Sequence, residues 1–245
     1  MSPEPALAGK SALVTGGARR IGRAIALALA RAGADVTITY RSSLSEAGAA
    51  IRELQTMGRA AQALECDVRS EPSVRAAVTA AAAFHGRLDI LVNNAAVFET
   101  VRLESMTLEQ WDAVFETNAR GPFLMAREAL PHLRRGQGRI VNIGSLGGLR
   151  PWAGHAHYCA SKAALHMLTQ AMAKAFAPEV SVNCVAPGWI EFEDDLREPA
   201  GRFAARAPLR RNGTAGEIAD AVVFFAAGPQ FITGQILAVD GGLGL

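Results

Sequence analysis

Two residues four positions apart, Tyr158 and Lys162, are the most specific chemical signal in the sequence. Tyrosine and lysine are both rare in this chain, so a Tyr-x-x-x-Lys match arises by chance with a probability of only about 0.02. On a helix such residues share a face, which places the ammonium beside the phenol. A phenol titrates at about pH 10 when unperturbed, and a neighbouring cation favours its ionised form. We therefore expect Lys162 to lower the pKa of Tyr158 toward the range that serves acid–base catalysis.

A glycine-rich turn at residues 15–22 follows the first β-rich run and leads directly into a helical pattern. Glycines at such a turn let the backbone approach a pyrophosphate, and the helix N-terminus offers unpaired N–H groups to the negative charge. A glycine turn alone is weak evidence, but this one stands at the first βα turn of a chain that alternates β and α throughout. The expected dinucleotide contacts here are Gly16, Arg19, Arg20, Ile21 and Gly22.

The second β-rich run ends in Tyr40, Arg41 and Ser42 rather than in a carboxylate. A site specific for NAD would place Asp or Glu there to bind the ribose 2′-hydroxyl. A guanidinium with adjacent hydroxyls suits a 2′-phosphate instead, and Arg19 is placed to close that pocket from the other side. A solvated surface arginine is the plain alternative for Arg41. The position at the strand end favours NADP(H) as the cofactor.

Short β-rich runs alternate with longer alanine-rich helical patterns along the whole chain. Several runs are continuously apolar, as expected for parallel strands that are buried on both faces. We expect strands at 11–15, 35–40, 60–66, 89–93, 139–143, 181–186 and 235–239, and helices at 20–31, 45–57, 72–85, 108–118, 123–133, 158–176 and 216–226. The predicted fold class is α/β: a single-domain doubly wound parallel sheet of Rossmann type over residues 1–245, with about seven strands and helices on both faces.

Residues 188–213 form the one long stretch without a clear assignment. It contains four acidic residues between 191 and 195, followed by five arginines between 197 and 211, and it follows the carboxyl end of a predicted strand. A segment of this kind at that end of a sheet is more often an active-site lid than a simple connection. We expect it to cover the substrate.

Composition excludes several classes of partner. Half of the 245 residues are apolar and the formal net charge is +2 with no basic block, which argues against nucleic acid. No charge-free apolar run approaches the roughly 18 residues of a membrane span, and residues 1–10 lack the pattern of a signal peptide. We expect a soluble cytoplasmic protein with a small-molecule substrate. Cys66, Cys159 and Cys184 are far apart, so neither a disulfide nor a metal site is predicted.

These motifs occur together with further short matches, which are Asp67, Asn93-Asn94-Ala95, Asn118, Ser145 and Pro187-Gly188. With them, the sequence resembles the short-chain dehydrogenase/reductase family over essentially its whole length. The resemblance implies Tyr158 as proton donor, Lys162 as ligand of the nicotinamide ribose, Ser145 as the group that polarises the carbonyl, and Asn118 as holder of a proton-relay water. It extends the implied cofactor contacts to Asp67, Val68, Asn94, Ala95, Tyr158, Lys162, Pro187, Gly188 and Ile190. It also implies a homotetramer paired through helices 123–133 and 158–176.

The sequence departs from the common family pattern at several positions. Arg20 stands where most members have the middle glycine of the turn, and with Phe98 and the Tyr40-Arg41-Ser42 run it resembles the bacterial pteridine reductase branch. Those reductases usually carry an aspartate where this chain has Ser145, and a serine there suits a ketone better than a C=N bond. Phe192 stands where many members use a threonine to hold the nicotinamide carboxamide, which puts that hydrogen bond in question.

Aromatic residues gather in the segments that should line the mouth of the sheet. The expected substrate contacts are Phe98, Ser145, Trp152, Tyr158 and Trp189, with His155, His157 and Phe192 nearby. They suggest a flat or hydrophobic substrate. The predicted activity is hydride transfer from NADPH to a carbonyl. The alternatives are a pteridine or dihydropterin reductase, a 3-oxoacyl-carrier-protein reductase, and a non-catalytic NADP(H)-binding sensor, which would have no use for Tyr158 and Lys162.

Overall fold

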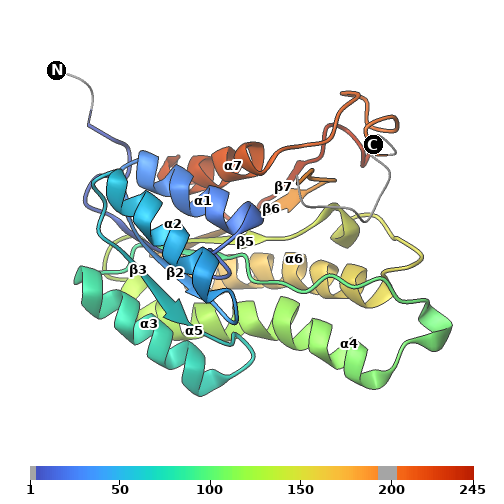
Figure 1. Cartoon of the computed structure of the whole chain (residues 1–245), viewed down its shortest axis with the longest axis horizontal. Coiled ribbons are helices and arrows are strands. Elements are labelled where there is room, and N and C mark those ends of the chain that lie inside the picture. Colours follow the sequence, from blue (N-terminus) through green and yellow to red (C-terminus); the bar gives the residue numbers. More distant parts are fainter. Residues whose placement is uncertain (1–3, 193–202) are drawn as a thin grey trace.

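The computed structural model describes residues 4–192 and 203–245 and has a central parallel sheet covered by helices on both sides (Figure 1). Its strands are β1 (Ser11–Val14), β2 (Asp35–Tyr40), β3 (Ala61–Glu65), β4 (Ile90–Asn93), β5 (Arg139–Ile143), β6 (Ser181–Pro187) and β7 (Ile236–Val239). They lie in the order β3-β2-β1-β4-β5-β6-β7. The order reverses direction between β1 and β4, so a crevice forms there at the carboxyl ends of the strands. The predicted fold class is confirmed.

Two layers of helices bury the two faces of the sheet. The helices are α1 (Arg20–Arg31), α2 (Leu44–Thr56), α3 (Glu71–His85), α4 (Leu108–Phe115), α5 (Gly121–Leu133), α6 (Ala156–Phe176) and α7 (Ala215–Ala227). One apolar core contains residues of α1, α2 and α7 and the other contains residues of α3, α5 and α6. In β1, Val14 faces the first core and Leu13 faces the second. Both side chains are fully buried, which explains the continuously apolar strand.

The region from 108 to 133 differs from the prediction of two separate helices. α4 continues through a π-helical turn, Glu116–Arg120, directly into α5. Pro122 explains the wide turn, because in a regular α-helix its ring would clash with the carbonyl of Asn118. Asn118 therefore lies inside a continuous helical segment and does not end a helix.

The sequence analysis predicted no membrane span, no metal site and no disulfide. Every helix among the described residues is too short or too polar to cross a lipid bilayer. Those residues also contain no group of three or more His, Cys, Asp or Glu side chains that is arranged to bind a metal ion. Cys66, Cys159 and Cys184 are free thiols. Of the expected lid at 188–213, residues 193–202 lie outside the described residues.

Candidate active site

A cavity of about 1400 Å³ lies at the carboxyl ends of the strands. Its walls contain Ser145, Tyr158, Lys162 and every residue expected to contact the cofactor. Phe98, Trp152 and Trp189 of the expected substrate group also line it. Two predicted residues do not: Asn118 is fully buried behind the wall, and His157 is buried away from the mouth of the sheet.

The glycine turn opens the N-terminus of α1 toward this cavity. Gly16 has φ +63°, and a Cβ atom on Gly22 would overlap the Gly16 carbonyl and come within 2.6 Å of Asn94 Nδ2. The Asn94 side chain donates to the carbonyls of Thr15 at 2.9 Å and Gly16 at 3.1 Å, which fixes the shape of the turn. The first turn of α1 carries no acidic residue, and its N-cap, Arg19, makes no capping hydrogen bond through its side chain. The N–H groups of this turn suit a pyrophosphate.

Arg20, the residue that replaces the middle glycine, has a left-handed backbone with φ +51°. Its guanidinium lies over the ring of Phe192, 5.1 Å from the centroid. The two departures from the family pattern in this region therefore contact each other, and both line the cavity.

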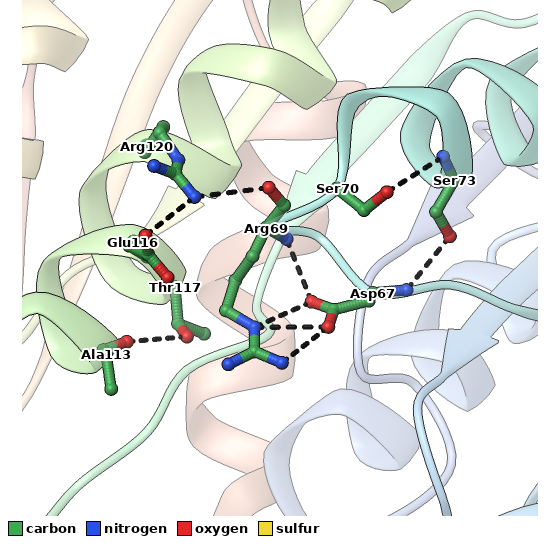
Figure 2. A network of polar contacts seen from close by, with 8 residues as sticks. All are labelled: Asp67, Arg69, Ser70, Ser73, Ala113, Glu116, Thr117 and Arg120. Atoms are coloured by element: carbon green, nitrogen blue, oxygen red, sulfur yellow. Dashed lines mark hydrogen bonds and ion pairs between the residues drawn. The ribbon is translucent and has the colours of Figure 1, made fainter. Parts of the chain in front are cut away.

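Asp67, at the expected adenine end of the cavity, is held by a residue that the sequence analysis missed. Arg69 donates to both carboxylate oxygens of Asp67, with its Nη2 2.6 Å from Oδ2 (Figure 2). This contact, aided by the nearby Arg41, lowers the pKa of Asp67 to about 2. Arg120, from the π-helical turn, donates to the backbone carbonyl of Arg69 at 3.3 Å and pairs with Glu116 (Figure 2). An Asp-x-Arg spacing such as Asp67-Val68-Arg69 carries no specific signal by itself, so the sequence analysis did not single out Arg69.

Ser145 lies just beyond β5 and is only 4% exposed. Its Oγ accepts a hydrogen bond from the backbone N–H of Gly147 at 3.0 Å. Burial raises the pKa of the Tyr158 phenol, and the nearby Ser145 side chain partly opposes this effect. Because Oγ uses an acceptor position on Gly147, the serine O–H stays available as a donor toward the cavity.

Tyr158 and Lys162 lie on the same face of α6, with the Lys162 ammonium 5.8 Å from the centre of the Tyr158 ring. Lys162 Nζ donates to the carbonyl of Ile143 at 2.8 Å. Burial raises the pKa of Tyr158 to about 12 and lowers the pKa of Lys162 to about 8. The expectation that Lys162 lowers the pKa of Tyr158 is therefore wrong, because burial raises this pKa and Lys162 is not among the groups that shift it.

Asn118 uses its side chain to fix the neighbouring loop. Oδ1 accepts from the Val97 N–H at 2.9 Å, while Nδ2 donates to the Val97 carbonyl at 3.0 Å and to Ser161 Oγ at 3.1 Å. These contacts commit the side chain to the protein. The backbone carbonyl of Asn118 differs, because the residue four positions later is Pro122, which has no N–H to donate.

A cluster of rings stands beside the phenol on the substrate side of the cavity. Phe98 packs edge-to-face against Tyr158 at 4.8 Å and stacks on His155 at 4.5 Å, and Trp152 is nearly parallel to the Tyr158 ring at 6.3 Å. His155 Nδ1 is 3.0 Å from the Glu99 carbonyl, so this nitrogen carries the hydrogen and donates it. Across the cavity, Trp189 stacks on Phe203 at 4.2 Å.

Comparison with known proteins decides the family. A family model described as enoyl-(acyl carrier protein) reductase matches residues 16–244. The chain is 38% identical over 256 residues to the short-chain dehydrogenase/reductase FrzI of Cladobotryum sp, with 99% of each chain covered. The chain belongs to the short-chain dehydrogenase/reductase family. The chain is also 37% identical to the 3-oxoacyl-[acyl-carrier-protein] reductase FabG of Staphylococcus aureus, with 96% of this chain and 98% of the relative covered.

Solved short-chain dehydrogenases/reductases have the same fold. A short chain dehydrogenase of Burkholderia cenocepacia in complex with NADP matches with a TM-score of 0.91 and 40% identity, covering 98% of this chain and 99% of that one. A blue fluorescent protein from a metagenomic library, in complex with NADPH, matches with a TM-score of 0.90 and 38% identity over 97% of this chain and 98% of that one. These relatives establish a short-chain oxidoreductase. They do not single out the pteridine reductase branch.

Proposed function

We propose that the protein is an NADPH-dependent carbonyl reductase, able to run in reverse as an alcohol dehydrogenase when the cofactor ratio demands it. The observation that carries the proposal is the arrangement of Ser145, Tyr158 and Lys162 at one end of the cavity and of Arg41 at the other, where the described lining residues include no unpaired carboxylate. A non-catalytic sensor would need the glycine turn and Arg41 but not a phenol beside two buried polar side chains, Ser145 and Lys162.

The cavity fits a nicotinamide dinucleotide phosphate by its own geometry. The uncapped first turn of α1, which a Cβ atom on Gly22 would obstruct, suits the pyrophosphate. Arg41 and Ser42, with Arg19, suit the 2′-phosphate. Asp67 would hold the adenine and Lys162 the nicotinamide ribose. When bound, the cofactor supplies the hydride.

The protein's own residues manage the proton and the charge on the carbonyl oxygen. Tyr158 holds a proton on its phenol oxygen, since burial keeps its pKa at about 12. The phenol therefore donates to a ketone oxygen as negative charge develops there. Ser145 donates a second hydrogen bond to the same oxygen. The Lys162 ammonium then stabilises the phenolate that is left on Tyr158.

Reprotonation of Tyr158 requires a path for the proton. We propose that the relay water binds to the backbone carbonyl of Asn118, because the side chain of Asn118 is already committed to Val97 and Ser161. Pro122 withholds the N–H that this carbonyl would meet in an α-helix. The role assigned to Asn118 then belongs to its backbone, and its side chain maintains the geometry.

The rings of Phe98, Trp152 and His155 beside Tyr158 favour a ketone with a flat or bulky apolar body. A 3-oxoacyl-carrier-protein substrate is the second candidate, since relatives at 37% identity carry that name. Docking an acidic carrier protein needs exposed arginines that are free to bind it. Arg127 on α5 is paired with Glu71 and Glu128, and Arg120 with Glu116, which weakens this candidate.

A third substrate class, the dihydropterins, is favoured by Arg20 and Phe98 but opposed by Ser145. A serine hydroxyl is a poor source of a full proton for a C=N nitrogen. The experiment that separates the three is a screen of the purified protein with NADPH against ketones, 3-oxoacyl thioesters and dihydropterins, following loss of cofactor absorbance. We expect the ketones to be reduced fastest. Rapid dihydropterin reduction without ketone turnover would reverse this ranking.

We also propose that the protein forms a cytoplasmic homotetramer whose interface is built from helices α5 and α6. Phe123 of α5 and Met167 of α6 are 42% and 65% exposed, which is unusual for large apolar side chains on helices. Burial of these faces against other copies would remove them from water. Size-exclusion chromatography with light scattering tests the oligomeric state, and a monomer at micromolar concentration would contradict the proposal.

A further inference from the structure

The catalytic face of α6 carries a third polar residue in the same register as Tyr158 and Lys162. His166 lies four residues after Lys162, one helical turn further along, and is only 6% exposed. It does not line the cavity, so it is not a candidate for contact with substrate or cofactor. A buried histidine at this position needs an explanation, since burying a polar ring is unfavourable unless it forms hydrogen bonds.

Two neighbouring hydrogen bonds join α6 to the strand end that carries Ser145. Lys162 Nζ donates to the Ile143 carbonyl at 2.8 Å, and the backbone N–H of Ser145 donates to His166 Nε2 at 3.4 Å. The helix holds Tyr158 and the strand end holds Ser145. The two contacts therefore set how the phenol and the serine hydroxyl lie relative to each other.

The turn around Ser145 is shaped to fit the imidazole. A Cβ atom on Gly144 would overlap His166 Nε2, and a Cβ atom on Gly148 would lie 2.6 Å from His166 Cε1. Neither glycine has a left-handed backbone, so the space they leave, and not their conformational freedom, explains them. Two glycines thus flank the catalytic serine at positions where any side chain would collide with this ring.

We propose that His166 is a positioning residue that holds the Ser145 N–H, and with it the serine hydroxyl, in the orientation needed for carbonyl reduction. The inference rests on the proposed function. If Lys162 turns toward the cofactor ribose, its bond to Ile143 weakens, and the contact between Ser145 and His166 remains to hold the turn. The ring must be neutral to accept the N–H at Nε2. Burial and the nearby Lys162 ammonium lower the pKa of His166 to about 4, which keeps it neutral.

The second ring nitrogen of His166, Nδ1, affects what replacement of the imidazole should do to stability. Among the described residues, His166 Nδ1 makes no hydrogen bond of good geometry, although the Gly148 backbone acts on the ring to favour its protonated form. An unsatisfied buried polar atom reduces stability. Replacing the ring with an apolar side chain removes this defect while leaving the Ser145 N–H without its acceptor, so the two effects on stability oppose each other.

The test compares His166→Leu, which cannot accept a hydrogen bond, with His166→Gln, whose side-chain oxygen can. Thr169→Val is the matched control, because Thr169 is a fully buried residue one turn further along α6 whose hydroxyl bonds to Asn142 and not to the Ser145 turn. We expect His166→Leu to lower kcat for ketone reduction by about 10- to 100-fold, the range for a misplaced catalytic group, with the Kd of NADPH and the melting temperature little changed. His166→Gln should recover most of the activity, and Thr169→Val should retain it.

Two further measurements separate positioning from general damage. In a Ser145→Ala background, His166→Leu should have almost no additional effect on kcat, because His166 acts through Ser145. Amide hydrogen exchange of residues 144–148 should rise in His166→Leu and stay slow in His166→Gln, and this readout does not depend on any substrate. If the unmutated protein reduces no ketone but the exchange result holds, only the proposed function fails. A fully active His166→Leu, additive effects with Ser145→Ala, or unchanged exchange would overturn the role of His166.

Discussion

The proposed preference for NADPH over NADH rests on one side chain, Arg41, and the structure defines what its removal should do. Arg41 follows β2, is exposed and lines the cavity. Arg41 contributes to the low pKa of Asp67, but that carboxylate is already paired with Arg69, whose Nη2 lies 2.6 Å from Oδ2. Arg41 is therefore available to a 2′-phosphate, and no unpaired carboxylate of the described strand end repels that group.

The expected magnitude follows from one charge-assisted contact. Such a hydrogen bond contributes roughly 1.5–3 kcal/mol, which corresponds to about a 10- to 150-fold preference for NADPH. Arg41→Ala should reduce the ratio of the two dissociation constants toward unity. Arg41→Asp adds repulsion, about 3 kcal/mol for unit charges roughly 5 Å apart at an effective dielectric constant of about 20, and less at this exposed position because of salt screening. We expect Arg41→Asp to equalise the two cofactors or to favour NADH.

The assay is a titration of both cofactors, by fluorescence or calorimetry, at two ionic strengths. Arg31→Ala is the matched control, because it removes an exposed arginine at the far end of α1 that does not line the cavity. This variant should keep the parent ratio. Equal dissociation constants for NADPH and NADH in the unmutated protein, or an unchanged ratio in Arg41→Ala, would refute the reasoning.

Three other substitutions or conditions test the chemistry at the opposite end of the cavity. Tyr158→Phe should leave the Kd of NADPH nearly intact and reduce turnover by roughly 10²–10⁴-fold, because it removes the proton donor; full activity on every substrate would exclude this role. The pKa of Lys162 is lowered to about 8, so its ammonium is present below that pH and lost above it, and kcat/KM for reduction should fall as the pH rises through this value. A pH profile that stays flat up to about pH 10 would contradict that assignment. Ser145→Asp should lower ketone reduction and raise any trace of dihydropterin reduction, which steady-state rates on both substrates would measure; unchanged rates would argue against a direct contact with the substrate.

The fold could be predicted from the sequence because its signals are local and repeat. Strands such as β1 are apolar on both faces, and the α1 pattern begins at Arg20 and ends at Arg31 as predicted. The region at 108–133 was predicted wrongly, because Pro122 reads along the chain as a break between helices. In the fold, a π-helical turn accommodates the proline, so the helix continues. The pattern of residues along the chain does not predict such a turn.

The chemistry of the site was harder to predict than its location. The spacing of Tyr158 and Lys162 along the helix predicts that the two side chains lie close together. The sequence does not show how deeply each is buried, and burial is the largest influence on both pKa values. Arg69 and His166 were missed for a related reason. Their partners, the Asp67 carboxylate and the Ser145 N–H, become apparent only when the fold brings the atoms together.

Arg20 and Phe192 show how two apparent departures from a family pattern can form one feature. They are 172 positions apart in the sequence, which gives no sign that the two changes are related. In the fold the Arg20 guanidinium lies 5.1 Å from the centre of the Phe192 ring. A non-glycine residue at φ +51° is destabilised by about 1–2 kcal/mol, and a cation–π contact returns about 0.5–2 kcal/mol. The two terms are similar in size, so the aromatic ring that replaces a threonine at one position stabilises the arginine that replaces a glycine at the other. The pair places a positive charge at the glycine turn and an apolar ring beside it, where the commoner pattern has a small residue and a hydroxyl.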